Sequence, residues 1–251
     1  MVERKLTTGA DPFNLTIDEL KTQLLRLVAG QDEAPISQRV KLLNQLLPLF
    51  DALEQRNPTP DVAQQIPLVQ GIWHSVWSTI PFQDILPGRV RQQSYQIFAD
   101  NGLYANIARY RPGHKQPWLN WVSKWLLSYD LMILQTYSVN RETDLAAQQW
   151  DIQNVGIRQV LRFGPTPLSV PVAKAWFQQA IAKYQQSSSA QQSLAMPESV
   201  SRTMKKRYQK VAEARPQLEH LYIDQDFRLV KTLREKNQRP SYTIAVRLPD
   251  A

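Results

Sequence analysis

The chain has 251 residues, of which 43% are apolar and 9% aromatic, so it can bury a core of the size expected for a folded globular protein. This composition excludes a wholly disordered chain. The absence of cysteine excludes disulfide scaffolds, thiol catalysis and cysteine-ligated metal centres.

The formal net charge is +8, and the basic excess lies in the last 101 residues. Residues 1–150 carry 14 basic and 14 acidic side chains, whereas residues 151–251 carry 16 and 8. Such a charge attracts anionic surfaces, and by itself it does not distinguish nucleic acid from acidic lipid headgroups. No apolar run reaches the about 18 residues of a spanning helix, and no secretion signal is recognisable, so a soluble or peripheral protein is expected.

Two amphipathic helices are predicted in the first 65 residues. Thr16 and Glu19 have the spacing of a capping box, apolar residues then recur at helical spacing, and Gly30 lies where this helix would end. A second helix is predicted from about Ser37 to Arg56, because the prolines that follow it at 58 and 60 disfavour further helix.

From about residue 68, short segments rich in β-branched and aromatic residues indicate seven strands, one of them the continuous segment 218–230. Asp100-Asn101-Gly102 predicts a hairpin between two of them. Residues 171–215 interrupt the pattern and are predicted as two helices around a Ser/Gln-rich linker. The fold class is therefore predicted to be mainly β with helices (α+β), with an antiparallel sheet that closes into a barrel.

The domain organisation follows from this order of elements. Residues 1–65 are expected to form a helical segment packed on the barrel. Residues 66–251 are expected to form the barrel itself, with the helical and linker insertion at about 171–215 before the last two strands.

Five segments carry a resemblance to a known family. They are LKTQLLRLVAG at 20–30, LEQRNPTP at 53–60, LVQGIWHSVWST at 68–79, LYIDQDFRLV at 221–230 and TIAVRL at 243–248. In order and spacing they resemble the PAP/fibrillin (plastid-lipid-associated protein) family over about residues 16–248. The chain departs from the family after the Asp-containing segment, where LVKTLREKNQRPSY contains no glycine.

The resemblance implies a lipocalin-like β-barrel that binds or organises lipophilic molecules such as carotenoids, quinones or lipids. It also implies a peripheral protein of thylakoid membranes or lipid globules. Because no transit peptide is recognisable at the start of the chain, the cyanobacterial type and the cytoplasmic side of the thylakoid membrane are expected.

The candidate ligand-binding residues include a tryptophan in a Gly-x-Trp motif. Gly71-Ile72-Trp73 resembles the motif that closes the floor of lipocalin-like barrels, where Arg228 or Arg247 could stack on the tryptophan. Strand alternation places Trp73, Ser75 and Trp77 on one face. Lining candidates in the next two strands are Tyr95 or Gln96, Ile97 or Phe98, and Tyr104 with Asn106 or the residues that alternate with them. The predicted ligand-binding residues are Trp73, Trp77, Phe98, Tyr104, Tyr137, Asp224, Asp226 and Arg228.

Asp224 and Asp226 are predicted to lie on one face of a strand together with Arg228. Two carboxylates at this spacing can hold a proton between them or accept hydrogen bonds from a ligand headgroup. The alternative is an exposed ladder of salt bridges, which adds little stability.

A membrane-contacting surface is predicted from two further segments. Residues 199–215 are predicted to form a basic amphipathic helix, and a tryptophan face is predicted at 118–125. The alternative for both segments is packing on the barrel. The predicted membrane or anion contacts are Arg202, Lys205, Lys206, Lys210, Trp118, Trp121 and Trp125.

Three classes of function remain open at this stage. The chain has only three histidines and none of the common catalytic or phosphate-binding motifs, so the first expectation is a non-enzymatic protein without a metal, whose partners are a small lipophilic ligand and an anionic membrane surface. The second is an interaction module with a filled barrel that docks on a photosynthetic or prenyl-lipid-synthesising complex. The third is an isomerase or cyclase that uses Asp224 or Asp226. Nucleic acid is not expected as a partner, because no recognised binding module is present.

Overall fold

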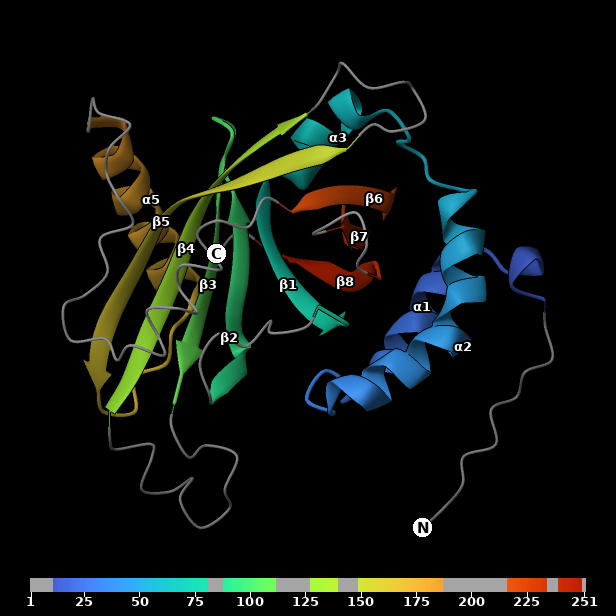
Figure 1. The fold of residues 1–251 in the computed structure, drawn as a ribbon, viewed down its shortest axis with the longest axis horizontal. Coiled ribbons are helices and arrows are strands. Elements are labelled where there is room, and N and C mark those ends of the chain that lie inside the picture. The colour runs from blue at the N-terminus through green and yellow to red at the C-terminus, as the bar shows by residue number, and fades with distance from the viewer. Residues whose placement is uncertain are drawn as a thin grey trace, which may run out of the picture.

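A computed structural model of the chain describes residues 11–80, 88–111, 127–139, 149–186, 216–233 and 239–249. Within them, eight antiparallel strands each pair with the next, and the last pairs with the first, so the sheet closes on itself in a barrel-like ring (Figure 1). The predicted α+β class with an antiparallel sheet is confirmed. The strands are β1 (Gly71–Ser78), β2 (Arg89–Phe98), β3 (Leu103–Tyr110), β4 (Leu127–Val139), β5 (Trp150–Phe163), β6 (Gln217–Ile223), β7 (Phe227–Leu233) and β8 (Ser241–Leu248).

The predicted single strand over residues 218–230 is wrong, because this segment is the hairpin of β6 and β7. The carboxylate of Asp224 forms the turn: its Oδ1 accepts hydrogen bonds from the backbone N–H groups of Asp226 (3.1 Å) and Phe227 (2.9 Å). Aspartate favours turns through such bonds to its own following backbone. The predicted hairpin at residues 100–102 is confirmed, with Gly102 at φ 77° between β2 and β3.

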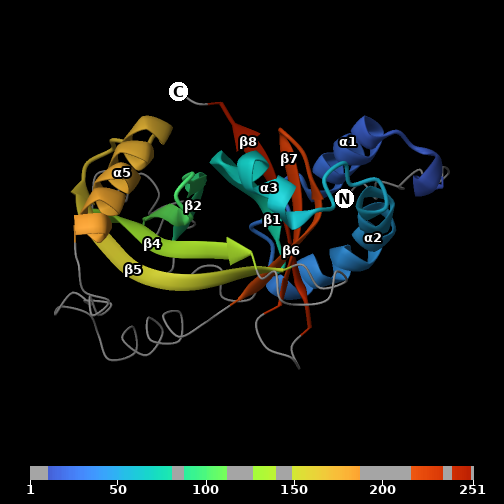
Figure 2. The same cartoon turned by 90° about the horizontal axis from the view of Figure 1, so that it is seen from above.

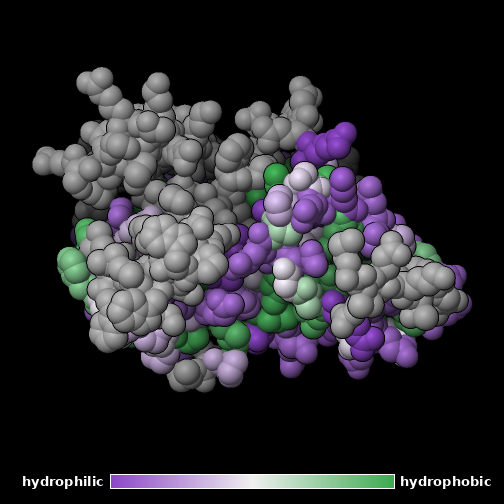
Figure 3. Space-filling model, turned by 90° about the horizontal axis from the view of Figure 1, so that it is seen from below, coloured by the Kyte–Doolittle hydropathy of each residue, from purple (hydrophilic) through white to green (hydrophobic). Residues whose placement is uncertain are grey.

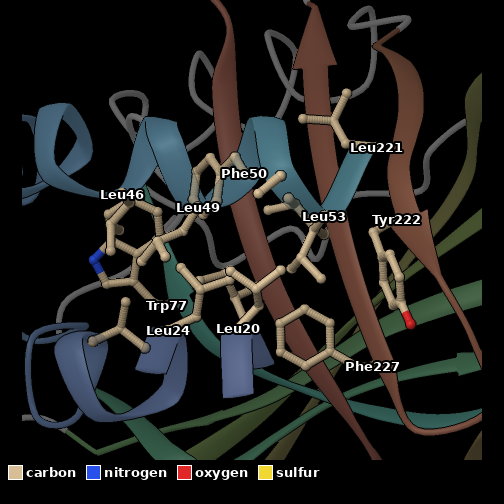
Figure 4. Packing of buried hydrophobic residues seen from close by; sticks show 14 residues of the cluster. Leu20, Leu24, Leu46, Leu49, Phe50, Leu53, Trp77, Leu221, Tyr222 and Phe227 are labelled. Atoms are coloured by element: carbon tan, nitrogen blue, oxygen red, sulfur yellow. The ribbon is translucent and has the colours of Figure 1, made fainter. Parts of the chain in front are cut away.

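The two predicted N-terminal helices are confirmed as α1 (Ile17–Val28) and α2 (Ile36–Glu54), preceded by the short 3-10 helix η1 (Pro12–Asn14). The capping box of Thr16 and Glu19 is formed. Both helices cover the outside of the ring at β6, β7 and β8 (Figures 1 and 4). Their apolar faces meet the outward side chains of these strands in one buried cluster, which includes Leu20, Leu24, Leu46, Phe50, Leu53, Tyr222, Phe227, Leu229 and Ile244.

A third helix, α3 (Val62–Val69), was not predicted. It begins at Asp61, whose side chain accepts a hydrogen bond from the backbone N–H of Ala63 at 2.9 Å. In the two ribbon views it lies over one end of the ring (Figures 1 and 2). Val62 and Val69 are buried there against aromatic side chains of the strands, so α3 closes this end.

The first helix of the predicted 171–215 excursion is confirmed as α5 (Val170–Gln186), on the opposite side of the ring from α1 and α2 (Figure 1). Its Phe177 and Ala180 pack on outward side chains of β2, β3 and β4, among them Ile97, Ile107 and Met132. The second helix of that excursion, at 199–215, lies outside the described residues. So do Trp118, Trp121, Trp125, Arg202, Lys205, Lys206 and Lys210.

The ring is paired unevenly around its circumference. β5 pairs with β4 along its whole length, but its register with β6 covers only Trp150 and Asp151. Beyond these residues β4 and β5 extend away from β6, β7 and β8 (Figure 1). Among the described strands the hydrogen-bonded wall is therefore continuous only near the end that α3 closes. None of the described helices is both long and apolar enough to cross a bilayer.

Candidate functional site

The interior face of the ring is set by alternation along the strands and by one bulge in β1. Trp73 and Ser75 pair with Arg247 and Ala245 and share their face. The register then shifts, so that Trp77 pairs with Ile244. Trp77 thus points outward into the cluster under α1 and α2 (Figure 4). The prediction that Trp77 shares the face of Trp73 is wrong, because a bulge reverses the alternation.

An aromatic floor fills the interior at the α3 end. It consists of Phe98, Tyr104, Tyr137 and Trp150. The rings of Phe98 and Tyr104 stack at 4.5 Å between centroids, and Tyr137 lies 5.7 Å from Phe98 and 5.3 Å from Trp150. Three of these residues were predicted as ligand-binding, and the structure places all three inside the ring. Trp150 was missed.

Trp73 is fully buried, and two arginine side chains stack on its ring. The guanidinium carbons of Arg228 and Arg247 lie 4.5 and 4.3 Å from the centroid of its ring, and its Nε1–H donates to the backbone carbonyl of Val69 at 2.7 Å. The predicted arginine stacking on Trp73 is therefore confirmed for both candidates. The hydrogen bond ties the tryptophan to the last turn of α3.

The two arginines have different surroundings. Arg247 donates to three backbone carbonyls, those of Leu68, Gln70 and Gln225. Arg228 is 2% exposed, lies 4.8 Å from the ring of Phe98, and makes no ion pair with any carboxylate of the described residues. Burial lowers the pKa of Arg228 to about 9, because an uncompensated charge is disfavoured away from water.

A belt of side-chain amides begins at Arg228 and crosses the interior. Arg228 Nη2 donates to Gln96 Oε1 at 2.7 Å, although β7 and β2 are not neighbours in the ring. Gln96 donates to Asn106 (3.0 Å), Asn106 to Gln135 (2.5 Å) and Gln135 to Asn154 (2.7 Å). We call these four amides the amide belt. Each amide accepts a hydrogen bond through its oxygen on the side of Arg228 and donates through its nitrogen to the next amide. The carbonyl oxygens therefore all point towards the cation, and the bonds reinforce one another.

The amide belt was only partly visible in the sequence. Of the alternatives, the structure places Gln96 and Phe98 in the interior, while Tyr95 and Ile97 pack under α5. Asn106 lies on the same interior face as Tyr104. Gln135 and Asn154 were missed. Their only signal in the sequence is an amide in an otherwise apolar or mixed strand, and the pairing of the four amides depends on strand register.

No protein-family model, no curated protein and no solved structure matches this chain. The chemistry of the site therefore rests on its own side chains. In the described part of the chain, no group of three or more histidine, aspartate or glutamate residues is arranged to hold a metal ion.

His220 faces the interior beside the aromatic floor. Its Nδ1 lies 3.1 Å from Oε1 of Gln65 on α3, an oxygen that also accepts from Trp150 Nε1 at 3.1 Å. An amide oxygen can only accept, so Nδ1 carries the proton, and Nε2 is a buried acceptor without a partner among the described residues. Burial, together with the charge of Arg228, lowers the pKa of His220 well below its ordinary 6.5.

The buried histidine predicts acid sensitivity. Between pH 6.5 and the lowered pKa, the unfolded chain binds a proton at His220 and the folded chain does not. Stability should therefore fall by up to about 1.4 kcal/mol for each pH unit below 6.5. Urea unfolding of the wild type and of His220→Gln from pH 7.5 to pH 5 measures this slope, which the substitution should reduce by about that amount. An unchanged slope in the variant would contradict the neutral state of His220.

Asp224 and Asp226 lie outside the ring, in the turn between β6 and β7, and Arg228 does not share their face. Lys21 of α1 forms ion pairs with both carboxylates, at 2.9 Å for Asp226. Burial alone raises the pKa of Asp224, but hydrogen bonds with Asp226, Lys21 and Tyr222 outweigh it and lower the pKa to about 2. These contacts hold α1 against the hairpin of β6 and β7. Both aspartates therefore have a structural role at this position.

Proposed function

We propose that this protein is a non-enzymatic binding protein that holds one small lipophilic molecule, such as a carotenoid, a quinone or a lipid, inside the ring. The observation that carries the proposal is a group of small side chains on the inner face beyond the amide belt. Register and alternation direct Ser94, Ala108 and Ala245 to the interior, and an eight-stranded ring with side chains this small on its inner face can hold one small ligand. Leu131 and Val230, on the same face, supply apolar contact area.

The side of the ring where β5 has no described partner beyond Asp151 supports this proposal. Leu161 and Phe163 of β5 are 55% and 78% exposed, and alternation from Ile157 directs them to the inner side of the sheet. Apolar side chains at the end of β5, which pairs with β4 but has no described partner on its other edge, suit the approach of a lipophilic molecule. In the view from below, described hydrophobic residues reach the surface in the middle of the molecule between hydrophilic ones (Figure 3).

We further propose that the ring is of the lipocalin-like type and that the protein is peripheral to thylakoid membranes or lipid globules. The stacking of Arg247 on the tryptophan of Gly71-Ile72-Trp73 supports the first point. The second rests on the resemblance to the PAP/fibrillin family and on the basic excess after residue 150, which suits anionic headgroups.

A second candidate function is favoured by the aromatic floor. Phe98, Tyr104, Tyr137 and Trp150 contact one another and leave the α3 end of the ring filled. If the remaining interior were filled as well, the protein would be an interaction module for a photosynthetic or prenyl-lipid-synthesising complex. The two functions differ in whether any small molecule enters the ring.

Titration with the neutral lipophilic dye Nile red tests the proposal. The wild type should bind about one equivalent, and Ala108→Trp should weaken binding by at least about tenfold because the indole would enter the interior where the proposed ligand lies. Ala182→Trp, at an exposed position on α5, is the matched control and should bind as the wild type does. Equal binding by all three proteins, with circular dichroism showing that Ala108→Trp is folded, would favour the filled interaction module.

A further inference from the structure

One row of the sheet, across β1, β8 and β7, places two buried polar atoms without partners on either side of a methyl group. Ser75 pairs with Ala245, and Ala245 pairs with Arg228, so the three side chains share the interior face. Among the described residues, the buried atoms Ser75 Oγ and Arg228 Nε have no hydrogen-bond partner. Ala245 is fully buried and has no atoms beyond Cβ to occupy the space between them.

We propose that this row is a headgroup site for a carboxylate, and that the ligand is a lipophilic carboxylic acid in its ionised form. The proposal rests on the proposed function, because it names the chemical class of the molecule held in the ring. In this site Arg228 supplies the charge, the hydroxyl of Ser75 supplies a second donor, and Ala245 leaves the room.

The charges around the row favour a single negative charge. A buried cation without a counter-ion is strongly unfavourable, and an anion beside it restores the balance. A second cation, Arg247, lies over the same tryptophan, but its donors are committed to the carbonyls of Leu68, Gln70 and Gln225. One cation with a free donor therefore faces the row, which matches one carboxylate better than a doubly charged phosphate.

The hydrogen bonds of Arg228 also favour an anion over a neutral group. Its Nη2 is engaged by Gln96, which holds the guanidinium in position across the interior, while Nε–H remains available. Hydrogen bonds between a guanidinium and a carboxylate are stronger than those to a neutral carbonyl, because the acceptor is charged. The chain of the ligand would then lie along Ala108, Leu131 and Val230, the surface that the proposed function assigns to it.

A matched pair of fluorescent probes tests the site at pH 8. cis-Parinaric acid is ionised at this pH, and its methyl ester has the same chain without the charge. The wild type should bind the acid at least about tenfold more tightly than the ester. Arg228→Met should weaken binding of the acid by about tenfold or more and change binding of the ester by less than about threefold, since one charged hydrogen bond is lost. Ser75→Ala should weaken binding of the acid by a few-fold.

Melting temperature separates loss of the site from loss of the fold. Arg228→Met removes an uncompensated buried charge, so its melting temperature without ligand should equal or exceed that of the wild type. Equal binding of acid and ester by the wild type, or binding of the acid that neither substitution weakens, would overturn the carboxylate site and leave the proposed function standing. Failure of both probes and of Nile red to bind would overturn the proposed function as well.

Discussion

Replacing Arg247 with methionine is expected to lower the free energy of unfolding by about 3–4 kcal/mol, because this side chain on β8 joins the end of α3 to the turn between β6 and β7. Its guanidinium donates to the carbonyls of Leu68 and Gln70 at the end of α3 and of Gln225 in the β6–β7 turn. Methionine preserves part of the contact with Trp73 but leaves these carbonyls without their donor. In a chain of this length the loss corresponds to a fall of about 10 °C in the melting temperature.

Arg26→Met on the exposed side of α1 is the matched control, and it should change stability by less than about 0.5 kcal/mol. Gly71→Ala disturbs the same region from the other side. Gly71 has φ 107°, and an added Cβ would lie 2.6 Å from Nη1 of Arg247. Because the clash requires Arg247, chemical denaturation of the double variant should show less destabilisation than the sum of the two single changes. Strict additivity, or a loss below 1 kcal/mol for Arg247→Met, would contradict this role.

The local features of the fold were predictable from short patterns. The capping box of Thr16 and Glu19 and the turn at Asn101-Gly102 depend on neighbouring residues, and both are present. The stacking of Arg228 and Arg247 on Trp73 was predicted from a resemblance rather than from spacing. The structure confirms the contact of both arginines with Trp73. Their different roles follow only from their other hydrogen-bond partners.

The errors arose where one residue changes the geometry of a strand. A bulge after Ser75 turns Trp77 to the outside, and alternation counted along the sequence contains no sign of it. Asp224 makes a turn in a segment whose composition is otherwise that of a strand, because its side chain bonds two backbone N–H groups. Both events decide which side chains enter the ring, so the predicted site contained Trp77, Asp224 and Asp226, which lie outside it.

The amide belt and the carboxylate row depend on long-range register. Gln96, Asn106, Gln135 and Asn154 come from four strands, and only their pairing makes a continuous chain of hydrogen bonds. Arg228 reaches this chain from the opposite wall. A charged residue in an apolar strand is a visible signal in the sequence, but only the folded chain shows that it has no carboxylate partner among the described residues.

The contrast between Arg228 and a second buried arginine predicts the other large effect. Arg109 is also 2% exposed, but it faces outward and is neutralised by the fully buried Asp130. Its Nε and Nη2 donate to the two carboxylate oxygens at 2.6 and 2.9 Å, and Arg162 adds a third bond at 3.1 Å. The three residues join β3, β4 and β5, while Arg109 also donates to the carbonyl of Thr166 before α5.

Asp130→Asn is expected to lower the free energy of unfolding by about 3–5 kcal/mol, because it preserves the shape of the side chain but leaves Arg109 buried without an anion. Asp51→Asn, at an exposed position on α2, is the matched control and should have little effect. The double variant Arg109→Met with Asp130→Leu removes both charges and should be more stable than Asp130→Asn in urea unfolding. If the double variant were the less stable of the two, the cost of an unpaired buried charge would not dominate at this site. Arg228 is a buried charge without a counter-ion among the described residues of the wild type. If such a charge cost little free energy, it would be a weaker reason for an anion to bind inside the ring.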